Sequence, residues 1–148
     1  MKGNPINILL ADDDLDDRNF FKEALEELPL LANLAIVHDG VELMNYLAST
    51  ANTFPDILFL DLNMPRKSGF DCLSEIKSDT RLKQLPVVIF STSLDLEVVN
   101  LLYKNGAQHY IRKPGEYPKL KRVILDVLTL TTQNNFTRPA RDQFVLET

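Results

Sequence analysis

Residues 8–14 read ILLADDD, so four apolar residues run directly into three consecutive carboxylates. A second apolar run, Ile57–Leu60, ends in one more carboxylate, Asp61. Unbroken apolar runs are typical of buried parallel strands, which carry their chemistry at their carboxyl ends. If the two runs are neighbouring strands, Asp12, Asp13 and Asp61 meet at one edge of the sheet. Clustered carboxylates repel one another, and a hard divalent cation such as Mg²⁺ is the simplest means of holding them together.

Short apolar segments alternate with amphipathic helical stretches along the chain, which predicts an α/β fold with a parallel sheet and helices on both faces. The five expected strands are Ile6–Ala11, Leu34–Val37, Asp56–Leu60, Val87–Phe90 and Ala107–Ile111. We expect the strand order 2-1-3-4-5. This order makes strands one and three neighbours at the switch point of the topology, which is where ligands bind in such sheets.

Local signals place several helix ends. Asp14, Asp16 and Asp17 suit the amino end of the first helix through capping and the helix dipole. Ser68 can cap the helix that follows the third strand, and Asn105-Gly106 is a suitable carboxyl end for the helix before the fifth strand. The polar stretch 132–148 is expected to be a tail, and the sequence does not settle whether it docks.

Composition excludes several classes of protein. The 148 residues are enough for one domain with a sizeable core. The net charge is -5, with Lys and Arg spread along the chain, which argues against a nucleic-acid surface. No apolar run approaches the ~20 residues that cross a bilayer. The single cysteine, Cys72, suits a reducing compartment and is expected to fill a core position. We therefore expect a cytoplasmic protein with no nucleic-acid or membrane partner.

Further distinctive residues follow or lie in the predicted third, fourth and fifth strands: Asn63, Ser91, Thr92, Tyr110, Lys113 and Pro114. Together with the acidic cluster, this ordered set resembles the receiver domain of two-component response regulators over about residues 6–130. The resemblance is to single-domain, chemotaxis-regulator-like receivers. The longer loops at 29–33 and 50–54, with the tail, are similar to the receivers that partner bacterial phytochrome-type kinases.

The resemblance implies a flavodoxin-like (βα)5 three-layer sandwich and a role for each landmark. Asp61 would be the phosphoacceptor. Asp12, Asp13, Asp61 and the main-chain carbonyl of Asn63 would hold Mg²⁺, with Mn²⁺ as a substitute. Lys113 would bind a phosphoryl oxygen.

Registering the fourth strand from Pro86 makes Ser91 the hydroxyl that binds another phosphoryl oxygen, with Thr92 as the alternative if the register slips by one. Ser91 and Tyr110 would form the conformational switch. The Lys113–Pro114 bond would be cis, as is typical of the family. Gly69 would allow a close backbone approach in the loop after Asp61.

The implied function is that of a stand-alone response regulator, and not of an enzyme acting on a separate substrate. It would accept phosphate from a sensor histidine kinase or phosphotransfer protein, promote its own phosphorylation and dephosphorylation, and signal to a downstream protein. The expected receiver spans residues 5–131, residues 132–148 form the tail, and no output domain is expected. Homodimerisation through the surface of the fourth helix, the fifth strand and the last helix stays a hypothesis. The sequence identifies neither the kinase nor the target.

Three other functions share parts of the pattern. A haloacid-dehalogenase-like phosphatase also forms an aspartyl phosphate, but it needs a second aspartate where this chain has Asn63. A flavodoxin-like electron carrier binds its flavin phosphate with a Ser/Thr-rich loop, where this chain has the three carboxylates that follow the first strand. A receiver-like module that binds partners without taking phosphate stays open as the alternative. His38 and His109 have no metal-ligand spacing and are expected to be structural.

Overall fold

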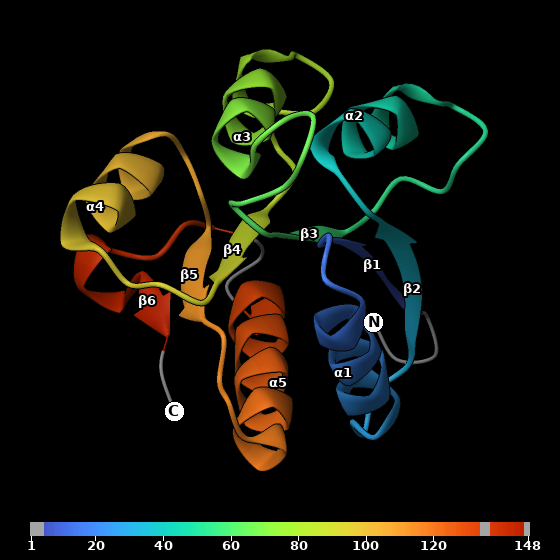
Figure 1. The fold of residues 1–148 in the computed structure, drawn as a ribbon, viewed down its shortest axis with the longest axis vertical. Helices are drawn as coiled ribbons and strands as arrows, with labels where there is room; N and C mark the ends of the chain where they lie inside the picture. The colour runs from blue at the N-terminus through green and yellow to red at the C-terminus, as the bar shows by residue number, and fades with distance from the viewer. Residues whose placement is uncertain (1–4, 134–136, 147–148) are drawn as a thin grey trace.

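The computed structural model describes residues 5–133 and 137–146, which fold around one six-stranded sheet of order β2-β1-β3-β4-β5-β6. All five strand pairings are parallel. Helices α1 and α5 lie on one side of the sheet and α2, α3 and α4 on the other (Figure 1). The predicted three-layer α/β architecture and the order 2-1-3-4-5 are therefore confirmed, with a sixth strand added beside β5.

The strands are β1 (Ile6–Ala11), β2 (Ala32–Val37), β3 (Ile57–Leu60), β4 (Val87–Ser91), β5 (His109–Arg112) and β6 (Val145–Leu146). The helices are α1 (Leu15–Glu26), α2 (Gly40–Ala48), α3 (Gly69–Ser78), α4 (Leu96–Lys104) and α5 (Tyr117–Gln133), with a 3-10 turn, η1, at Arg141–Gln143. In the part of the chain that is described, no helix has the length and apolar character that a bilayer span requires.

Two expected strand starts are wrong by two residues, each for a local reason, and the other expected strand ends differ from the structure by at most one residue. β2 begins at Ala32 rather than Leu34 because it pairs with β1 along its whole length, starting at Ile6. β5 begins at His109 rather than Ala107, because the Ala107 amide donates to the Leu102 carbonyl at 3.1 Å and closes the turn after α4.

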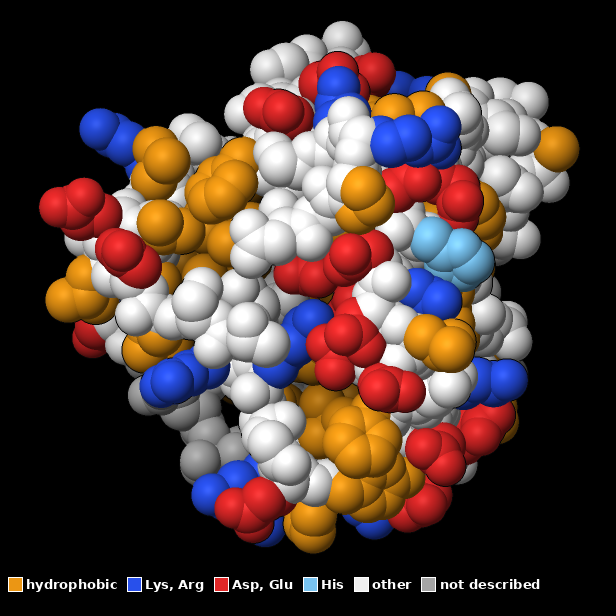
Figure 2. Space-filling model, viewed as in Figure 1, with side chains coloured by type: hydrophobic (Ala, Val, Ile, Leu, Met, Phe, Trp, Pro, Cys, Tyr) orange, Lys and Arg blue, Asp and Glu red, His pale blue; other side chains and the backbone are white. Residues whose placement is uncertain are grey.

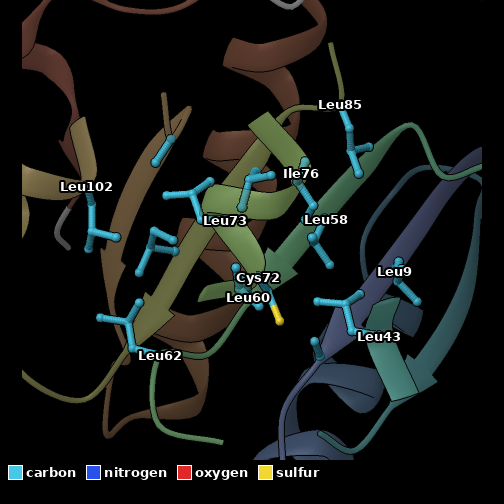
Figure 3. Close-up of a cluster of buried hydrophobic side chains, with 14 of the residues drawn as sticks. Leu9, Leu43, Leu58, Leu60, Leu62, Cys72, Leu73, Ile76, Leu85 and Leu102 are labelled. Atoms are coloured by element: carbon cyan, nitrogen blue, oxygen red, sulfur yellow. The ribbon is translucent and has the colours of Figure 1, made fainter. Parts of the chain in front are cut away.

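Each face of the sheet carries its own hydrophobic core. Every residue of β3 and β4 is buried, as expected of central parallel strands. The core under α2, α3 and α4 contains Cys72, as predicted, among leucines from the strands and α3 (Figure 3). The core under α1 and α5 is centred on Phe21, Phe59 and Phe90, whose ring centroids lie 4.9–6.3 Å apart at steep angles.

Side-chain caps and a glycine mark the ends of the helices. Asp14 caps α1 by accepting the Asp17 amide, and Ser68 caps α3 by accepting the Asp71 amide, as predicted. Gly106, which follows the end of α4, has φ of 100°, a left-handed conformation that glycine adopts at little cost. The caps fix where α1 and α3 begin, and these helices follow β1 and β3, whose carboxyl ends carry the candidate site.

Gly69, the first residue of α3, lies against the loop after β3. Its amide donates to the Leu62 carbonyl at 2.9 Å, and a Cβ atom here would stand only 2.3 Å from the Asp61 carbonyl oxygen. The close approach expected at Gly69 is confirmed, and it ties α3 to the backbone of Asp61.

The C-terminal segment, residues 137–146, docks on the body of the protein. β6 pairs with β5 through Tyr110↔Val145 and Ile111↔Leu146. Phe144 is fully buried beside the rings of Tyr103 and Tyr110, with centroid distances of 5.1 and 6.5 Å. The part of the expected tail that the structure describes therefore covers the outer edge of β5, which settles the question that the sequence left open.

Candidate functional site

Pairing of β1 with β3 brings the two acidic strand ends together. Ala11 pairs with Leu60, and the Asp61 amide donates to the Ala11 carbonyl at 3.0 Å, so Asp12 and Asp61 follow neighbouring strand positions. Carboxylate oxygens of Asp12, Asp13 and Asp61 lie within 4.8 Å of one another. Figure 2 shows acidic side chains gathered near the middle of this face, with basic side chains beside them.

The three carboxylates differ in exposure and in hydrogen bonding. Asp12 is fully buried, and its Oδ1 accepts the Asp14 amide at 3.0 Å. Asp61 is buried, and its Oδ1 accepts the Asn63 amide at 3.4 Å. Asp13 is exposed, so the cluster opens to solvent on one side. An approaching ion or phosphoryl group has access from that side.

Lys113 reaches the cluster from the segment that follows β5. Its Nζ donates to Asp12 Oδ2 at 2.8 Å and to Asp17 Oδ2 at 2.9 Å, and lies 3.6 Å from Asp61 Oδ2. Burial opposes the charged form, but the hydrogen bonds to Asp12 and Asp17 and the neighbouring negative charges outweigh it. Together they hold the pKa of Lys113 above its usual value. The ammonium is therefore a fixed positive charge beside Asp61.

Asp61 has a carboxyl pKa that is clearly shifted from its usual value. Burial raises the pKa of Asp61 to about 6, opposed by the charge of Lys113 and assisted by the charges of Asp12 and Asp13. The group is mainly ionised at neutral pH and poorly hydrated. A carboxylate in that state has a high tendency to bind a cation or to act as a nucleophile.

Asp17 is a site residue that the sequence reasoning assigned only to the helix start. It lies in the first turn of α1. Helical spacing does not relate it to the cluster, because Asp13 precedes the N-cap Asp14 and is not part of the helix. Arg18 was also missed; its guanidinium donates to the Asp12 carbonyl at 3.1 Å and holds the first turn of α1 to the strand end.

The two hydroxyls considered after the fourth strand differ in position. Ser91 is the last residue of β4 and is fully buried, whereas Thr92 is exposed. The Ser91 carbonyl accepts the Lys113 amide at 2.7 Å, so the strand end that bears Ser91 is joined to the segment that bears Lys113.

Tyr110 is fully buried in β5, and its hydroxyl donates to the Ser93 carbonyl at 2.5 Å. The Ser93 amide in turn donates to Ser91 Oγ at 3.4 Å, a long hydrogen bond. Ser91 and Tyr110 also share one face of the sheet, because Ser91 lies two residues beyond Ile89, the cross-strand partner of Tyr110. Ser93 is therefore the link between the two residues that the sequence grouped as a switch.

The expectation of a cis Lys113–Pro114 bond is not met, since no peptide bond among the described residues is cis. An X–Pro bond prefers trans by only ~0.5–1 kcal/mol, so Pro114 permits a cis bond without requiring it. With this bond trans, the Lys113 ammonium already reaches Asp12 and Asp17.

The donor set fits a hard divalent cation. Three carboxylates from two strand ends can offer one oxygen each, and these oxygens lie within 4.8 Å of one another. Mg²⁺ is usually held by few carboxylates and keeps several waters, which suits a cluster with one open side.

Comparison with known proteins agrees with this geometry. A family model described as "Response regulator receiver domain" matches residues 8–125. The chain is 31% identical over 124 residues to response regulator Rcp1 of Synechocystis sp., covering 81% of this chain and 84% of that protein. It is 32% identical over 123 residues to chemotaxis protein CheY1 of Helicobacter pylori, covering 83% of this chain and 97% of that protein.

Solved structures give the same result. The Mn²⁺-bound form of response regulator Rcp1 superposes with a TM-score of 0.79 at 29% identity, covering 92% of this chain and 100% of that one. The phosphorylated cyanobacterial phytochrome response regulator RcpA superposes with a TM-score of 0.78 at 33% identity, covering 93% and 100%.

Proposed function

The chain belongs to the response regulator receiver domain family, and we propose that it accepts a phosphoryl group on Asp61 in a reaction that requires Mg²⁺. One observation carries the proposal. The buried Asp61 carboxyl lies with Asp12 and Asp13 in a cluster of oxygens within 4.8 Å, and the Lys113 ammonium stands 3.6 Å from it. The receiver unit is proposed to span residues 5–131, with residues 132–148 as a C-terminal extension.

Asp61 acts as the nucleophile. One of its carboxylate oxygens attacks the phosphorus of a phosphohistidine on a sensor kinase or phosphotransfer protein, and an O–P bond forms. The N–P bond of the donor breaks, and its electron pair leaves with the imidazole nitrogen. The product is an acyl phosphate on Asp61. Its negative charge adds to that of Asp12 and Asp13, so the transfer needs positive charge at the site.

Asp12, Asp13, Asp61 and the Asn63 carbonyl are proposed to hold the cation, with Mn²⁺ as a substitute for Mg²⁺. The bound cation supplies positive charge that offsets the phosphoryl oxygens and keeps attacking group and phosphate together. The Mn²⁺-bound form of the relative Rcp1 supports a divalent ion in this family.

Lys113 and Ser91 are proposed to bind the remaining phosphoryl oxygens. The Lys113 ammonium is within reach of a group on Asp61, and its bonds to Asp12 and Asp17 keep it charged. Ser91 donates its hydroxyl, with Thr92 as the alternative donor. Movement of Ser91 toward the phosphoryl group changes its contact with Ser93, and through Ser93 it biases the position of Tyr110. Such a population shift would carry the signal to a downstream protein.

Acetyl phosphate provides a direct test, because it replaces the kinase as donor. We expect wild-type protein to take up one phosphoryl group per chain with Mg²⁺ or Mn²⁺, and none with EDTA, as measured by intact-mass spectrometry and phosphate-affinity gels. Asp61→Asn is expected to lose labelling while keeping the circular dichroism spectrum.

Asp16→Asn is the matched control, because Asp16 is an exposed aspartate on α1 and should label normally. Full labelling of Asp61→Asn would refute the acceptor assignment. Folded wild-type protein that binds Mg²⁺ but takes no label from acetyl phosphate or from a kinase would instead identify a receiver that only binds partners.

A further inference from the structure

The loop between β3 and α3, residues 61–68, begins with the proposed phosphoacceptor and carries Asn63, whose carbonyl is proposed to bind the cation. A main-chain oxygen cannot be moved by a change of side-chain rotamer, so its position depends on the backbone of the loop. A loop that is held in place before the cation arrives binds it more tightly than one that must first become ordered. The contacts that hold this loop therefore bear on the affinity of the site.

Arg66 lies in a backbone conformation that residues other than glycine seldom adopt. Its φ is 66°, and among the described residues no other non-glycine residue has a positive φ. The Lys67 amide donates to the Pro65 carbonyl at 2.7 Å, so three residues close a γ-turn with Arg66 at its centre. A γ-turn with a positive φ at its centre is rare and strained. Such a conformation persists only where surrounding contacts offset the strain.

The guanidinium of Arg66 makes a contact of this kind with Asp39, the residue before α2. Its Nε donates to Asp39 Oδ2 at 3.1 Å, and its Nη2 donates to Asp39 Oδ1 at 3.3 Å. Two bonds between one guanidinium and one carboxylate fix direction as well as distance, and they are stronger than bonds between neutral groups. The Arg66–Asp39 pair therefore joins the β3–α3 loop to the start of α2.

Asp39 is a well-fixed partner, because a second hydrogen bond holds its side chain. It is the N-cap of α2, and its Oδ1 accepts the Glu42 amide at 2.8 Å. The Asp39 side chain is only 14% exposed, whereas that of Arg66 is 59% exposed. The same carboxylate caps a helix and receives the guanidinium, so Arg66 is attached to α2 itself rather than to a freely rotating side chain.

The backbone of the loop also lies directly against the start of α2. A Cβ atom at Gly40, the first residue of α2, would stand 2.1 Å from the Lys67 carbonyl oxygen. The Cys72 Sγ of α3 donates to the Gly40 carbonyl at 3.6 Å. With the loop this close to α2, the Arg66–Asp39 pair can form only while the two segments stay together.

The chain between Arg66 and Asn63 has little freedom. Met64 is 8% exposed and belongs to the core under α2, α3 and α4, and Pro65 has a fixed φ. The contact of Asn63 itself is weaker, because its amide donates to Asp61 Oδ1 at 3.4 Å. A cation or phosphoryl group on Asp61 would compete for that carboxylate. Holding Arg66 therefore helps to hold Asn63 when the site is filled.

We propose that Arg66 is a positioning residue, whose bidentate pair with Asp39 keeps the strained loop in the conformation that the cation requires. This role deepens the phosphoryl-transfer function proposed for Asp61 and depends on it. Arg66 acts through the loop and the Asn63 carbonyl rather than by contact with the phosphoryl group. The start of α2 thereby helps to determine the Mg²⁺ concentration at which the site fills.

Two substitutions break the pair while they change the net charge in opposite directions. Arg66→Gly removes the guanidinium and leaves a residue that adopts a positive φ without strain. Asp39→Asn keeps a good N-cap for α2 but loses the charge and one of the two acceptors. By charge alone, Arg66→Gly should strengthen Mg²⁺ binding and Asp39→Asn should weaken it. We expect both variants to bind Mg²⁺ about three- to fivefold more weakly in calorimetry, the upper range for an exposed ion pair.

The double variant Arg66→Gly with Asp39→Asn shows whether the two losses have one cause. If they do, the double variant should bind Mg²⁺ about as well as the weaker single variant, because the second change has no pair left to break. Independent losses would multiply instead. Arg122→Ala is the control, because it removes an exposed arginine of α5 and should keep the wild-type affinity.

Labelling with acetyl phosphate separates positioning from chemistry. In Arg66→Gly the Mg²⁺ concentration that gives half the maximal labelling rate should rise about three- to fivefold, in line with the affinity. The rate at saturating Mg²⁺ should stay within about twofold of the wild-type rate, because the reacting groups are intact. Arg66→Lys keeps the charge without the fork of donors and should lie between wild-type protein and Arg66→Gly.

Two measurements need no cation. In ¹⁵N relaxation, the amides of Asn63 and Lys67 should have lower order parameters in Asp39→Asn than in wild-type protein. Arg66→Ala breaks the same pair as Arg66→Gly but keeps a Cβ atom, for which a positive φ is costly. Its urea denaturation midpoint should therefore lie below that of Arg66→Gly. The opposite order would overturn the strained loop on which the proposal depends.

An Mg²⁺ affinity of Arg66→Gly that equals or exceeds the wild-type value would overturn the proposal, as would losses that multiply in the double variant. Either result, in protein whose wild-type form takes the label, would leave Asp61 as the acceptor. Wild-type protein that takes no label would instead contradict the proposed function. Calorimetry with Mg²⁺ alone needs no phosphoryl donor, so it would still measure the effect of the pair.

Discussion

Asp61 is buried beside two other carboxylates, so its ionisation lowers the free energy of unfolding when no cation is bound. Burial raises the pKa of Asp61 to about 6, whereas an aspartate in an unfolded chain titrates near ~3.9. The folded protein therefore binds this proton more tightly than the unfolded chain does. Stability from this group is fully present below about pH 4 and is lost as the pH rises to about 6.

Asp61→Asn cannot ionise, so it should escape this loss. We expect the variant, in EDTA near pH 7.5, to be more stable than wild-type protein by on the order of 2 kcal/mol, from a shift of about two pKa units. The advantage should vanish near pH 4. Urea denaturation across this range measures it, with the exposed Asp16→Asn as a control that should stay within ~0.5 kcal/mol. An advantage that is independent of pH would show that ionisation of Asp61 is not its cause.

Asp17 binds the Lys113 ammonium more closely than Asp61 does, with Nζ–Oδ2 distances of 2.9 Å to Asp17 and 3.6 Å to Asp61. In Asp17→Asn the ammonium loses one charged partner and should move toward Asp61, where it competes with the cation. The variant also loses the negative charge of Asp17, which further weakens attraction of the cation. We expect Mg²⁺ affinity to fall about threefold, the size of a partly exposed charge interaction.

Asp16→Asn is the control for Asp17→Asn, because it removes a charge from the same helix turn without touching Lys113. Its Mg²⁺ affinity, measured by calorimetry beside that of Asp17→Asn, should stay close to the wild-type value. Equal affinities for the two variants would exclude a specific role of Asp17 in placing Lys113.

The acidic site was predictable because strand ends of a parallel sheet converge, so Asp12 and Asp61 needed only the correct topology. Lys113 followed from the family resemblance, and its contact with Asp61 at 3.6 Å agrees with it. The bond to Asp17 depends on how α1 is oriented over the strand end. Sequence periodicity limits that orientation only to a face of the helix, so it could not show which carboxylate receives the ammonium.

At the scale of elements, the central strands and helix caps were the most predictable parts. β3 and β4 are buried on both faces, which leaves an unbroken apolar run in the sequence. The prediction of β5 was less accurate, because the strand is short and Ala107 lies in the turn before it. Its boundary depends on a hydrogen bond to Leu102, a tertiary detail that propensity does not contain.

The first residue of α3, Gly69, packs directly against the backbone of the loop that follows Asp61, and this contact helps to fix the loop's position. In Gly69→Ala the new Cβ would stand 2.3 Å from the Asp61 carbonyl oxygen, so α3 or the loop must move. We expect a loss of about 1–3 kcal/mol in unfolding free energy, as for other overpacked sites. A weaker Mg²⁺ affinity should accompany it, because the Asn63 carbonyl belongs to the same loop.

Gly115→Ala is the matched control for Gly69→Ala, because a Cβ at Gly115 would meet nothing within 4 Å. It should be neutral or stabilising by up to ~1 kcal/mol, through a less flexible unfolded chain. Equal urea denaturation midpoints for the two variants would show that the α3 contact is not tight.

At the scale of the whole molecule, the C-terminal segment was the least predictable part. Phe144 lies in a mainly polar stretch, and no periodic pattern marks it as buried. The Phe144 ring packs against Tyr103 and Tyr110, which lie far from it in the sequence. These contacts form only once α4 and β5 are in place. Docking of this kind is a property of the assembled fold rather than of local propensity.

Tyr110 connects this segment with the acidic site. Its amide donates to the Phe144 carbonyl at 3.0 Å, and its hydroxyl donates to the Ser93 carbonyl at 2.5 Å. Ser93 is joined to Ser91 by the long bond from its amide to Ser91 Oγ, at 3.4 Å. A ligand on Asp61 that draws the Ser91 hydroxyl toward it vacates space on the face of the sheet that Tyr110 shares. The buried position of Tyr110, and with it the seat of Phe144, should then become more stable.

Beryllofluoride, which imitates a phosphoryl group on an aspartate, tests this connection. With Mg²⁺ it should slow hydrogen exchange of the Tyr110 amide in wild-type protein about fivefold, within the usual range of coupling between sites. Because coupling is reciprocal, Phe144→Ala should weaken beryllofluoride binding by a similar factor. Leu28→Ala is the control, because it truncates a half-buried side chain just past the end of α1, on the other face of the sheet, and should change neither quantity.

The two ways in which the beryllofluoride experiment can fail have different meanings. Unchanged exchange at Tyr110, in protein whose ¹⁹F NMR spectrum shows bound beryllofluoride, would break the connection and leave the phosphoryl site standing. No bound beryllofluoride in the presence of Mg²⁺ would contradict the phosphoryl site itself. The docking of residues 137–146 is present in the structure without a ligand at Asp61, so neither outcome would contradict it.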